Sequence, residues 1–413
     1  MTRHSSTRTT WAWRALALAC RALAVLLLLA LWNSAPAADG TAERRIDDVS
    51  DVPAAARLAL FEAQQLRETS YPDQAVDLLL GFLEEYPDQD HFLVRFHLAV
   101  SWSRRGDQEN AIREYGRAVE MEPLFAQGWL NMGELAYNLG RYGLAASSLT
   151  RGYEVSEWKD PNVLFFTSAA YVMDGRPEEA VPLLRELVDD PETETKLEWH
   201  RALVMAYLDL DDDENGSRAV RAMLEQYRDD PEAWQIAFQY SASRSDYEKA
   251  VVALIITGYL RPLSVDEQMT LGDLFLAVGV PSRAGDLYEG ALADSGTTAD
   301  LERLASAHVA AYEFDEARVV LGRALEQEST PRLWSLLGDM NFMDKDYEGS
   351  MEAYRRSAEA DTVSGRAWLM MGYCAIQLER YGVAIPPLER AAAFDDVGEK
   401  ASQLLGALRA MIE

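Results

Sequence analysis

The feature that most constrains this chain is a pattern that recurs ten times: a small side chain followed four positions later by a larger apolar one. The small residues recur about every 34 positions, from 31 between Ala219 and Ala250 to 39 between Ala180 and Ala219. Residues four apart share one helix face, so the pattern predicts stacked helical units that bury their apolar faces against one another. The pairs are Ala75 with Leu79, Ala111 with Tyr115, Ala145 with Leu149, Ala180 with Leu184, Ala219 with Met223, Ala250 with Leu254, Ala284 with Tyr288, Ala317 with Leu321, Ser350 with Tyr354, and Ala384 with Leu388.

A second motif places Gly on the helix before several of these pairs. Gly allows two antiparallel helices to approach closely, while Trp and Leu fill the space between them. Together the motifs resemble the tetratricopeptide repeat, in ten copies from about residue 56 to residue 396. The resemblance implies an all-α fold, a right-handed α-solenoid of helix-turn-helix repeats. The second motif occurs as Trp129-x-x-Met132-Gly133, Trp334-x-x-Leu337-Gly338 and Trp368-x-x-Met371-Gly372.

The repeat register divides the chain into segments. The register slips once, where the acidic stretch 208–216 is expected to enlarge a turn and to mark a bend or boundary. After the last repeat, an amphipathic helix is expected to shield the apolar edge of the array. The expected segments are a signal peptide (1–37), a linker (38–55), a first half of the array (56–230), a second half (231–396) and a capping helix (397–413).

The N-terminus has the three parts of a secretory signal: basic residues, an apolar core and a small-residue cleavage site. Arg3, Arg8 and Arg14 precede the apolar run 22–31, and Ala37 ends the expected cleavage site. We therefore expect an exported, periplasmic protein. The alternative is an uncleaved N-terminal segment that anchors the protein in the inner membrane.

The charge of the chain bears on its partners. Asp and Glu number 68 and Lys and Arg number 39, which gives a formal charge of -29. Phosphate backbones and anionic lipid surfaces repel such a protein. We therefore expect protein partners with basic or apolar-anchored segments, and neither a nucleic acid nor a small-molecule substrate.

The sequence contains no motif of a common catalytic or cofactor site. A Walker-type glycine loop, H-E-x-x-H, G-x-S-x-G and C-x-x-C are all missing from it. Its five histidines lack metal-ligand spacing, and Cys374 lies beside Gly372 on an expected packing helix. The chain is therefore predicted not to be an enzyme and to bind no cofactor.

One acidic stretch matches the start of a calcium-binding loop. Asp211, Asp213 and Asn215 fit the opening D-x-[DN]-x-[DN]-G, but Ala222 occupies the position of the required Glu. We interpret the stretch as a solvated acidic turn, with weak calcium binding as the alternative.

The first helix of each repeat is expected to line the inner surface of the solenoid. Aromatic and Met side chains projected onto that surface suit a peptide with apolar anchors, and acidic residues such as Glu134, Asp273, Glu302 and Asp339 lie among them. The alternative is that half of the projected side chains pack between repeats. The candidate groove residues are Phe96, Leu130, Tyr137, Phe165, Met173, Met269, Phe342, Met343, Leu369 and Tyr373.

The second half resembles a narrower group, the periplasmic tetratricopeptide proteins of proteobacteria encoded alongside ExbB, ExbD and TonB. The likeness implies an accessory role in TonB-dependent uptake of iron complexes, through contacts with the periplasmic parts of that machinery. The alternative is a scaffold for exopolysaccharide export or outer-membrane assembly. The likeness lies in stretches 258–260, 271–284, 304–305, 337–338, 371–372 and 401–404.

Overall fold

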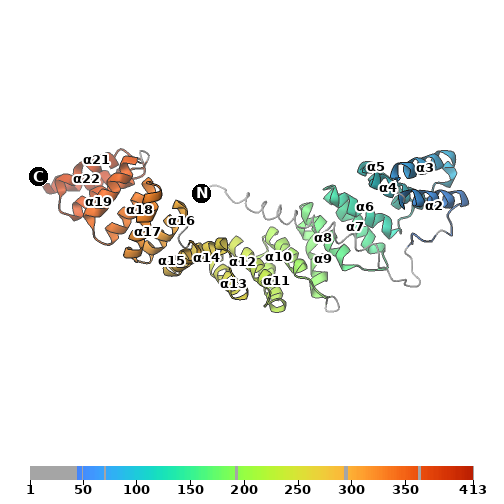
Figure 1. The fold of residues 1–413 in the computed structure, drawn as a ribbon, viewed down its shortest axis with the longest axis horizontal. Helices are drawn as coiled ribbons and strands as arrows, with labels where there is room; N and C mark the ends of the chain where they lie inside the picture. Colours follow the sequence, from blue (N-terminus) through green and yellow to red (C-terminus); the bar gives the residue numbers. More distant parts are fainter. Residues whose placement is uncertain are drawn as a thin grey trace. The chain divides into compact units, whose positions relative to one another are not determined.

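The structure is a computed structural model that describes residues 44–48, 50–68, 71–190, 194–292, 296–360 and 364–412. These residues form helices and no strand (Figure 1). The predicted signal peptide 1–37 lies outside the described residues. The described end of the predicted linker packs on the first repeats: Val52 is buried, and the Arg44 backbone N–H donates to the Leu124 carbonyl oxygen at 3.2 Å.

Helices α2 to α21 form ten helix-turn-helix pairs, and α22 follows them. The even-numbered helix of each pair is its first helix, and the odd-numbered one is its second helix. This architecture confirms the predicted all-α solenoid of ten repeats. The helices are α2 (Ala54–Glu68), α3 (Pro72–Glu85), the 3-10 turn η2 (Pro87–Gln89), α4 (Phe92–Arg105), α5 (Gln108–Met121), α6 (Ala126–Asn138), α7 (Tyr142–Val155), α8 (Pro161–Met173), α9 (Pro177–Asp189), α10 (Leu197–Asp209), α11 (Asp213–Gln226), α12 (Pro231–Ser243), α13 (Tyr247–Leu260), α14 (Val265–Ala277), α15 (Pro281–Leu292), α16 (Thr298–Ala310), α17 (Phe314–Gln327), α18 (Pro331–Met343), α19 (Tyr347–Ala360), α20 (Arg366–Gln377), α21 (Tyr381–Ala391) and α22 (Gly398–Ile412).

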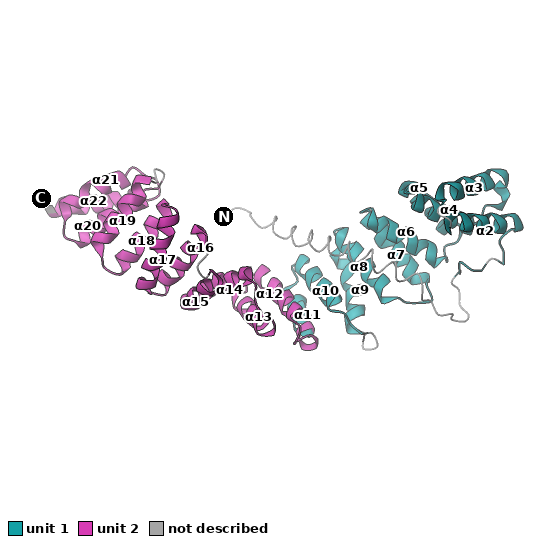
Figure 2. Cartoon of the chain, in the orientation of Figure 1, with its two compact units in different colours: residues 1–222 teal, residues 223–413 magenta. Residues whose placement is uncertain are grey.

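The chain divides into two compact units, residues 1–222 and residues 223–413 (Figure 2). The division falls within α11. The sequence pattern predicts a division between residues 230 and 231, at the start of α12. Each unit is a stack in which every helix pair packs on its neighbour, so contacts are mainly between adjacent elements.

The recurrent small residue lies at the centre of each pair. Nine of the ten small residues are completely buried, and Ala219 is half-buried. All ten larger residues four positions later are at most 5% exposed. These two positions therefore form the repeating core, as the sequence pattern predicts.

The glycines of the first helices fit closely against these larger residues. A Cβ added at Gly133 would lie 2.7 Å from Leu149 Cγ, and one at Gly338 would lie 2.8 Å from Tyr354 Cε1. Gly372 has the same relation to Leu388 of α21. Distances below 3.0 Å exclude a side chain, so Gly is required for the two helices to reach this separation.

The turn at residues 210–212 corrects one expectation. It joins α10 to α11 in three residues and holds Asp211 at φ 56°, in the same left-handed conformation as Gly175 and Ser245 at the equivalent turns. The acidic stretch therefore does not enlarge this turn. Part of the 39-residue interval comes from the loop between the end of α9 at Asp189 and the start of α10 at Leu197. The rest is a shift of register, because α9 and α11 begin 36 residues apart and the residue equivalent to Ala180 is the buried Gly216, three positions before Ala219. The sequence pattern indicated that the repeat register changes in this region, but it did not show which part of the repeat contains the change.

Helix α22 closes the C-terminal end of the array, as predicted. It packs on α21 and buries Ala401, Leu405 and Leu408. Within the described part of the chain, no helix combines the length and the apolar character needed to cross a membrane.

The close fit at glycine gives a stability prediction. Gly372→Ala places a methyl group against Leu388 and is expected to destabilise the protein by about 1–3 kcal/mol, because the packed pair must separate. Gly322→Ala on α17 is the control, since no atom lies within 4 Å of the added Cβ. The control is expected to be neutral, or stabilising by up to about 1 kcal/mol through helix propensity. Urea unfolding measures both, and equal midpoints for the two variants would contradict the assignment.

Candidate functional site: the first-helix faces

The first helices form the inner surface within each unit. Neighbouring first helices contact one another at α2 and α4, at α8 and α10, and at α16 and α18, whereas the second helices contact mainly first helices. Because neighbouring repeats approach each other more closely through their first helices than through their second helices, the first helices form the inner side of the stack. The ten candidate groove residues were predicted on this side.

Three of those candidates are buried in the core and are not open to a ligand. Phe96 is 3% exposed and its ring packs against Tyr115 and Phe125, at centroid distances of 5.6 and 5.0 Å. Met269 and Leu369 are 7% and 6% exposed. A helical side chain leans toward the N-terminal turn of its own helix, so a projection that uses spacing alone misplaces residues at the edge of a face.

The other seven candidates keep accessible surface. Leu130, Tyr137, Phe165, Met173, Phe342 and Tyr373 are half-buried, and Met343 is exposed. Their role in binding stays a prediction.

Four of these residues belong to the neighbouring helices α6 and α8 of unit 1. Helix α8 has no charged residue between Pro161 and Met173, and its side chains are buried or half-buried on every side. The Phe166 ring, which was not among the predicted groove residues, packs against the Tyr137 ring with a distance of 6.4 Å between the ring centroids. The α6 and α8 faces together therefore present half-exposed aromatic side chains that an apolar anchor can contact.

A carboxylate lies beside these aromatic residues. Glu134 of α6 is half-buried, and among the described residues no hydrogen bond or ion pair engages it. Burial raises the pKa of Glu134. A half-buried carboxylate without a partner gains stability when a cation or hydrogen-bond donor approaches it. Glu134 is therefore the acidic candidate of unit 1.

The three acidic residues predicted for the first-helix face of unit 2 differ, because each is paired with an arginine of the next repeat. Asp339 of α18 accepts a hydrogen bond at 2.7 Å from Arg366 of α20. On the same inner side, Asp273 pairs with Arg303 at 3.9 Å, and Glu302 pairs with Arg332. The acidic surface expected from the sequence is therefore largely neutralised in unit 2.

Two of these carboxylates also accept from a buried tyrosine. The Tyr288 hydroxyl donates to Asp273 at 2.6 Å, and the Tyr354 hydroxyl donates to Asp339. Burial and this hydrogen bond raise the pKa of both tyrosines. Each acid thus connects the second helix of its own repeat to the first helix of the next one.

Unit 1 carries a cationic cluster at its N-terminal end. Arg67 of α2 donates to the His97 carbonyl oxygen at 3.1 Å and lies 2.7 Å from His97 Nδ1. Arg104 of α4 donates to the Arg67 carbonyl oxygen at 3.3 Å. Burial, with Arg104 nearby, lowers the pKa of Arg67 to about 10. Burial, with Arg67 nearby, lowers the pKa of His97 to about 3, so His97 is neutral and its Nδ1 accepts from Arg67.

Two stretches of the chain, residues 98–161 and 302–364, match the family model described as the tetratricopeptide repeat. The chain is a tetratricopeptide-repeat protein. The two matches cover complete helix pairs in both units, and the remaining pairs continue the same motif.

Solved structures similar to this repeat protein share little sequence with it. MamA is 17% identical with a TM-score of 0.37, covering 41% of this chain and 94% of its own. PilW, described as a type IV pilus biogenesis factor, is 16% identical with a TM-score of 0.36, covering 51% and 98%. Yeast Tom70 is 12% identical with a TM-score of 0.34, covering 86% and 96%. Scores of this size carry no argument about function. No curated protein sequence matches the chain.

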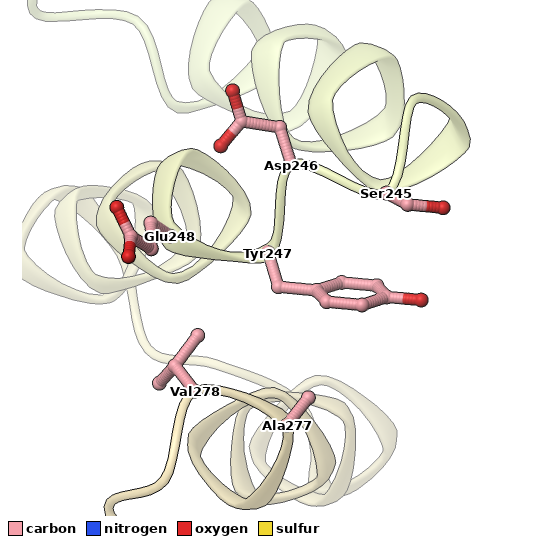
Figure 3. A pocket seen from close by; sticks show the side chains of 6 residues that line it. All are labelled: Ser245, Asp246, Tyr247, Glu248, Ala277 and Val278. Atoms are coloured by element: carbon pink, nitrogen blue, oxygen red, sulfur yellow. The ribbon is translucent and has the colours of Figure 1, made fainter.

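One pocket of this tetratricopeptide-repeat protein lies at helix ends in unit 2, with a volume of about 430 Å³. Figure 3 shows the Tyr247 ring extending across it, with Ala277 and Val278 on the opposite side. Asp246 caps α13 by accepting from the Lys249 backbone N–H at 3.2 Å and binds the Lys249 ammonium at 2.6 Å. Of the two carboxylates that line the pocket, Asp246 and Glu248, the first is therefore engaged in capping.

The calcium candidates lie at the start of a helix. Asp212 caps α11 by accepting from the Asn215 backbone N–H at 3.1 Å and its side-chain amide at 2.7 Å. Asp213 and Asn215 are in the first turn of α11, which continues past Ala222, the position of the missing Glu. Within the described ranges, no group of three or more His, Cys, Asp or Glu side chains is placed to hold a metal ion.

Half-buried His97 makes the stability of this repeat protein depend on pH. Its folded pKa of about 3 lies below the unfolded value of 6.5, so the stabilisation is complete above pH 6.5 and is lost as the pH falls toward 3. Wild type is expected to lose up to about 1.4 kcal/mol per pH unit below 6.5 from this group. His97→Gln, which keeps an acceptor for Arg67, is expected to reduce that slope between pH 6.5 and 5. Urea unfolding across this range measures it, and identical slopes would contradict the prediction.

Proposed function

We propose that this chain is a non-catalytic scaffold that binds segments of other proteins on its first-helix faces. The observation that carries the proposal is the surface of α6 and α8, which combines half-exposed aromatic side chains with the unpaired carboxylate of Glu134. Such a surface offers contact area for apolar anchors and one charge that fixes orientation.

The expected partner segment carries apolar anchors and a basic side chain. Tyr137 and Phe165 contact the anchors, and Glu134 pairs with the Lys or Arg of the segment. The paired acids on the first-helix face of unit 2, such as Asp339 with Arg366, weaken the attraction of that face for cations. We therefore expect unit 1 to bind the basic side chain of the partner segment.

We further propose that the protein acts in the periplasm, as an accessory of a TonB-type energy-transduction system for iron uptake. The proposal is supported by the secretory pattern of residues 1–37 and by the resemblance of residues 231–413 to periplasmic tetratricopeptide proteins of such systems. A scaffold for exopolysaccharide export or outer-membrane assembly is the competing role.

Cross-linking in cells followed by capture of the protein distinguishes these roles. The proposal expects periplasmic parts of TonB or ExbD among the captured proteins. It also expects their loss when Phe165→Glu places a charge on the α8 face. Capture of polymer-secretion proteins alone would contradict the TonB role, and cytoplasmic partners alone would contradict export.

The role of Glu134 gives a binding prediction. Glu134→Gln is expected to weaken binding of peptides with aromatic anchors and one Lys or Arg by about three- to tenfold, because a partly buried charge pair is lost. Glu120→Gln on the exposed side of α5 removes the same charge without touching this face, and is expected to leave affinity unchanged. Titration by fluorescence anisotropy measures both variants. Equal affinities for wild type and Glu134→Gln would exclude Glu134 from the site.

A further inference from the structure

The outer face of α13 in unit 2 is apolar where the other second helices are charged. Val252, Ile256 and Tyr259 occupy positions i, i+4 and i+7, which share one helix face. Val252 is 53% exposed, Tyr259 is 86% exposed and Ile256 is half-buried between them. We call these three residues the α13 stripe. No charged residue occurs from Ala250 to Leu260.

The repeat provides an internal comparison for this stripe. Its residues lie two, six and nine positions after the small residue Ala250. At the same positions α19 has Glu352, Arg356 and Glu359, and α5 has Arg113, Arg117 and Glu120. Each of the other nine second helices has at least one charged residue among these three positions. The α13 stripe is therefore a departure from the pattern of the array, and not a property of every repeat.

The ends of the stripe are polar and complementary. Glu248 lies four positions before Val252 on the same face, and the Tyr259 hydroxyl lies at the other end. Neither side chain has a hydrogen bond or ion pair to another described residue. A two-fold axis near residues 253 and 254 would place Glu248 of one copy opposite Tyr259 of another, at both ends of an antiparallel helix pair. The hydroxyl then donates to the carboxylate, and the apolar residues meet in the middle.

We propose that the α13 stripe is a self-association surface, at which two copies of this chain pair through antiparallel α13 helices. A two-fold contact of this kind closes on itself and stops at the dimer. The net charge of -29 makes two copies repel each other, so an uncharged helix is the place where they approach at least cost. Because the stripe lies on a second helix, pairing leaves the first-helix faces free.

Sedimentation equilibrium of the full chain tests the proposal. The experiment covers about 1 to 100 µM protein, because contact of one helix with another is smaller than a standard protein interface. Wild type is expected to rise from the mass of one chain to twice that mass. The dimer is expected to tighten from low salt to about 0.5 M salt, where screening removes repulsion between the copies.

Matched variants locate the contact. Val252→Glu is expected to raise the dimer dissociation constant by at least about tenfold, since it buries a carboxylate without a partner. Val319→Glu is the control, because Val319 is 64% exposed at the same repeat position on α17. It is expected to dimerise like wild type. Tyr259→Glu faces Glu248 of the second copy and weakens the dimer, whereas Tyr259→Lys preserves it.

Four results would overturn the proposal. One is a wild-type protein that stays at the mass of one chain throughout, including at high salt. Another is equal dimerisation of Val252→Glu and Val319→Glu, which would place the contact elsewhere. The third is equal weakening by Tyr259→Glu and Tyr259→Lys, which would exclude the antiparallel arrangement. Circular dichroism checks that each variant is folded, and binding of the stripe to lipid vesicles without dimerisation also counts against the proposal.

Discussion

The close approach of a small residue on the first helix to a large residue on the second one is the interaction on which the rest of the structure depends. Gly272 against Tyr288 and Gly372 against Leu388 show it most directly, because each glycine leaves room for no side chain. This contact fixes the separation within a pair, and stacking of pairs then fixes which faces of the first helices remain open. The candidate binding surface is a consequence of this packing.

The charges of the inner surface follow from the same stacking. When one first helix lies beside the next, Asp339 of α18 meets Arg366 of α20, and Tyr354 donates to the same carboxylate. Carboxylates that would otherwise attract basic ligands thereby hold repeats together. Glu134 has no such neighbour among the described residues, and it remains available for recognition. Although the protein carries many carboxylates, only a few of them are therefore unpaired on the candidate binding surface.

The sequence predicted the fold well because the repeat is a local pattern. Ala384 and Leu388 are four residues apart, and any helix places them on one face. It predicted the exposure of the candidate groove residues less well, because exposure depends on the neighbouring repeat: Met269 is buried although its spacing matches that of exposed residues. The pairing of Asp273 with Arg303 required knowledge of the stacking. A carboxylate followed about 30 residues later by Arg was the available signal, and it occurs again at Glu302 and Arg332.

A double-mutant cycle between Gly272 and Tyr288 tests the central claim most directly. If the glycine exists to admit the tyrosine ring, Gly272→Ala destabilises wild type but costs much less in a Tyr288→Ala background, where removal of the ring leaves room for the methyl group. The account predicts a coupling energy of at least about 1 kcal/mol from urea unfolding of the four proteins. Additive effects of the two substitutions would contradict it.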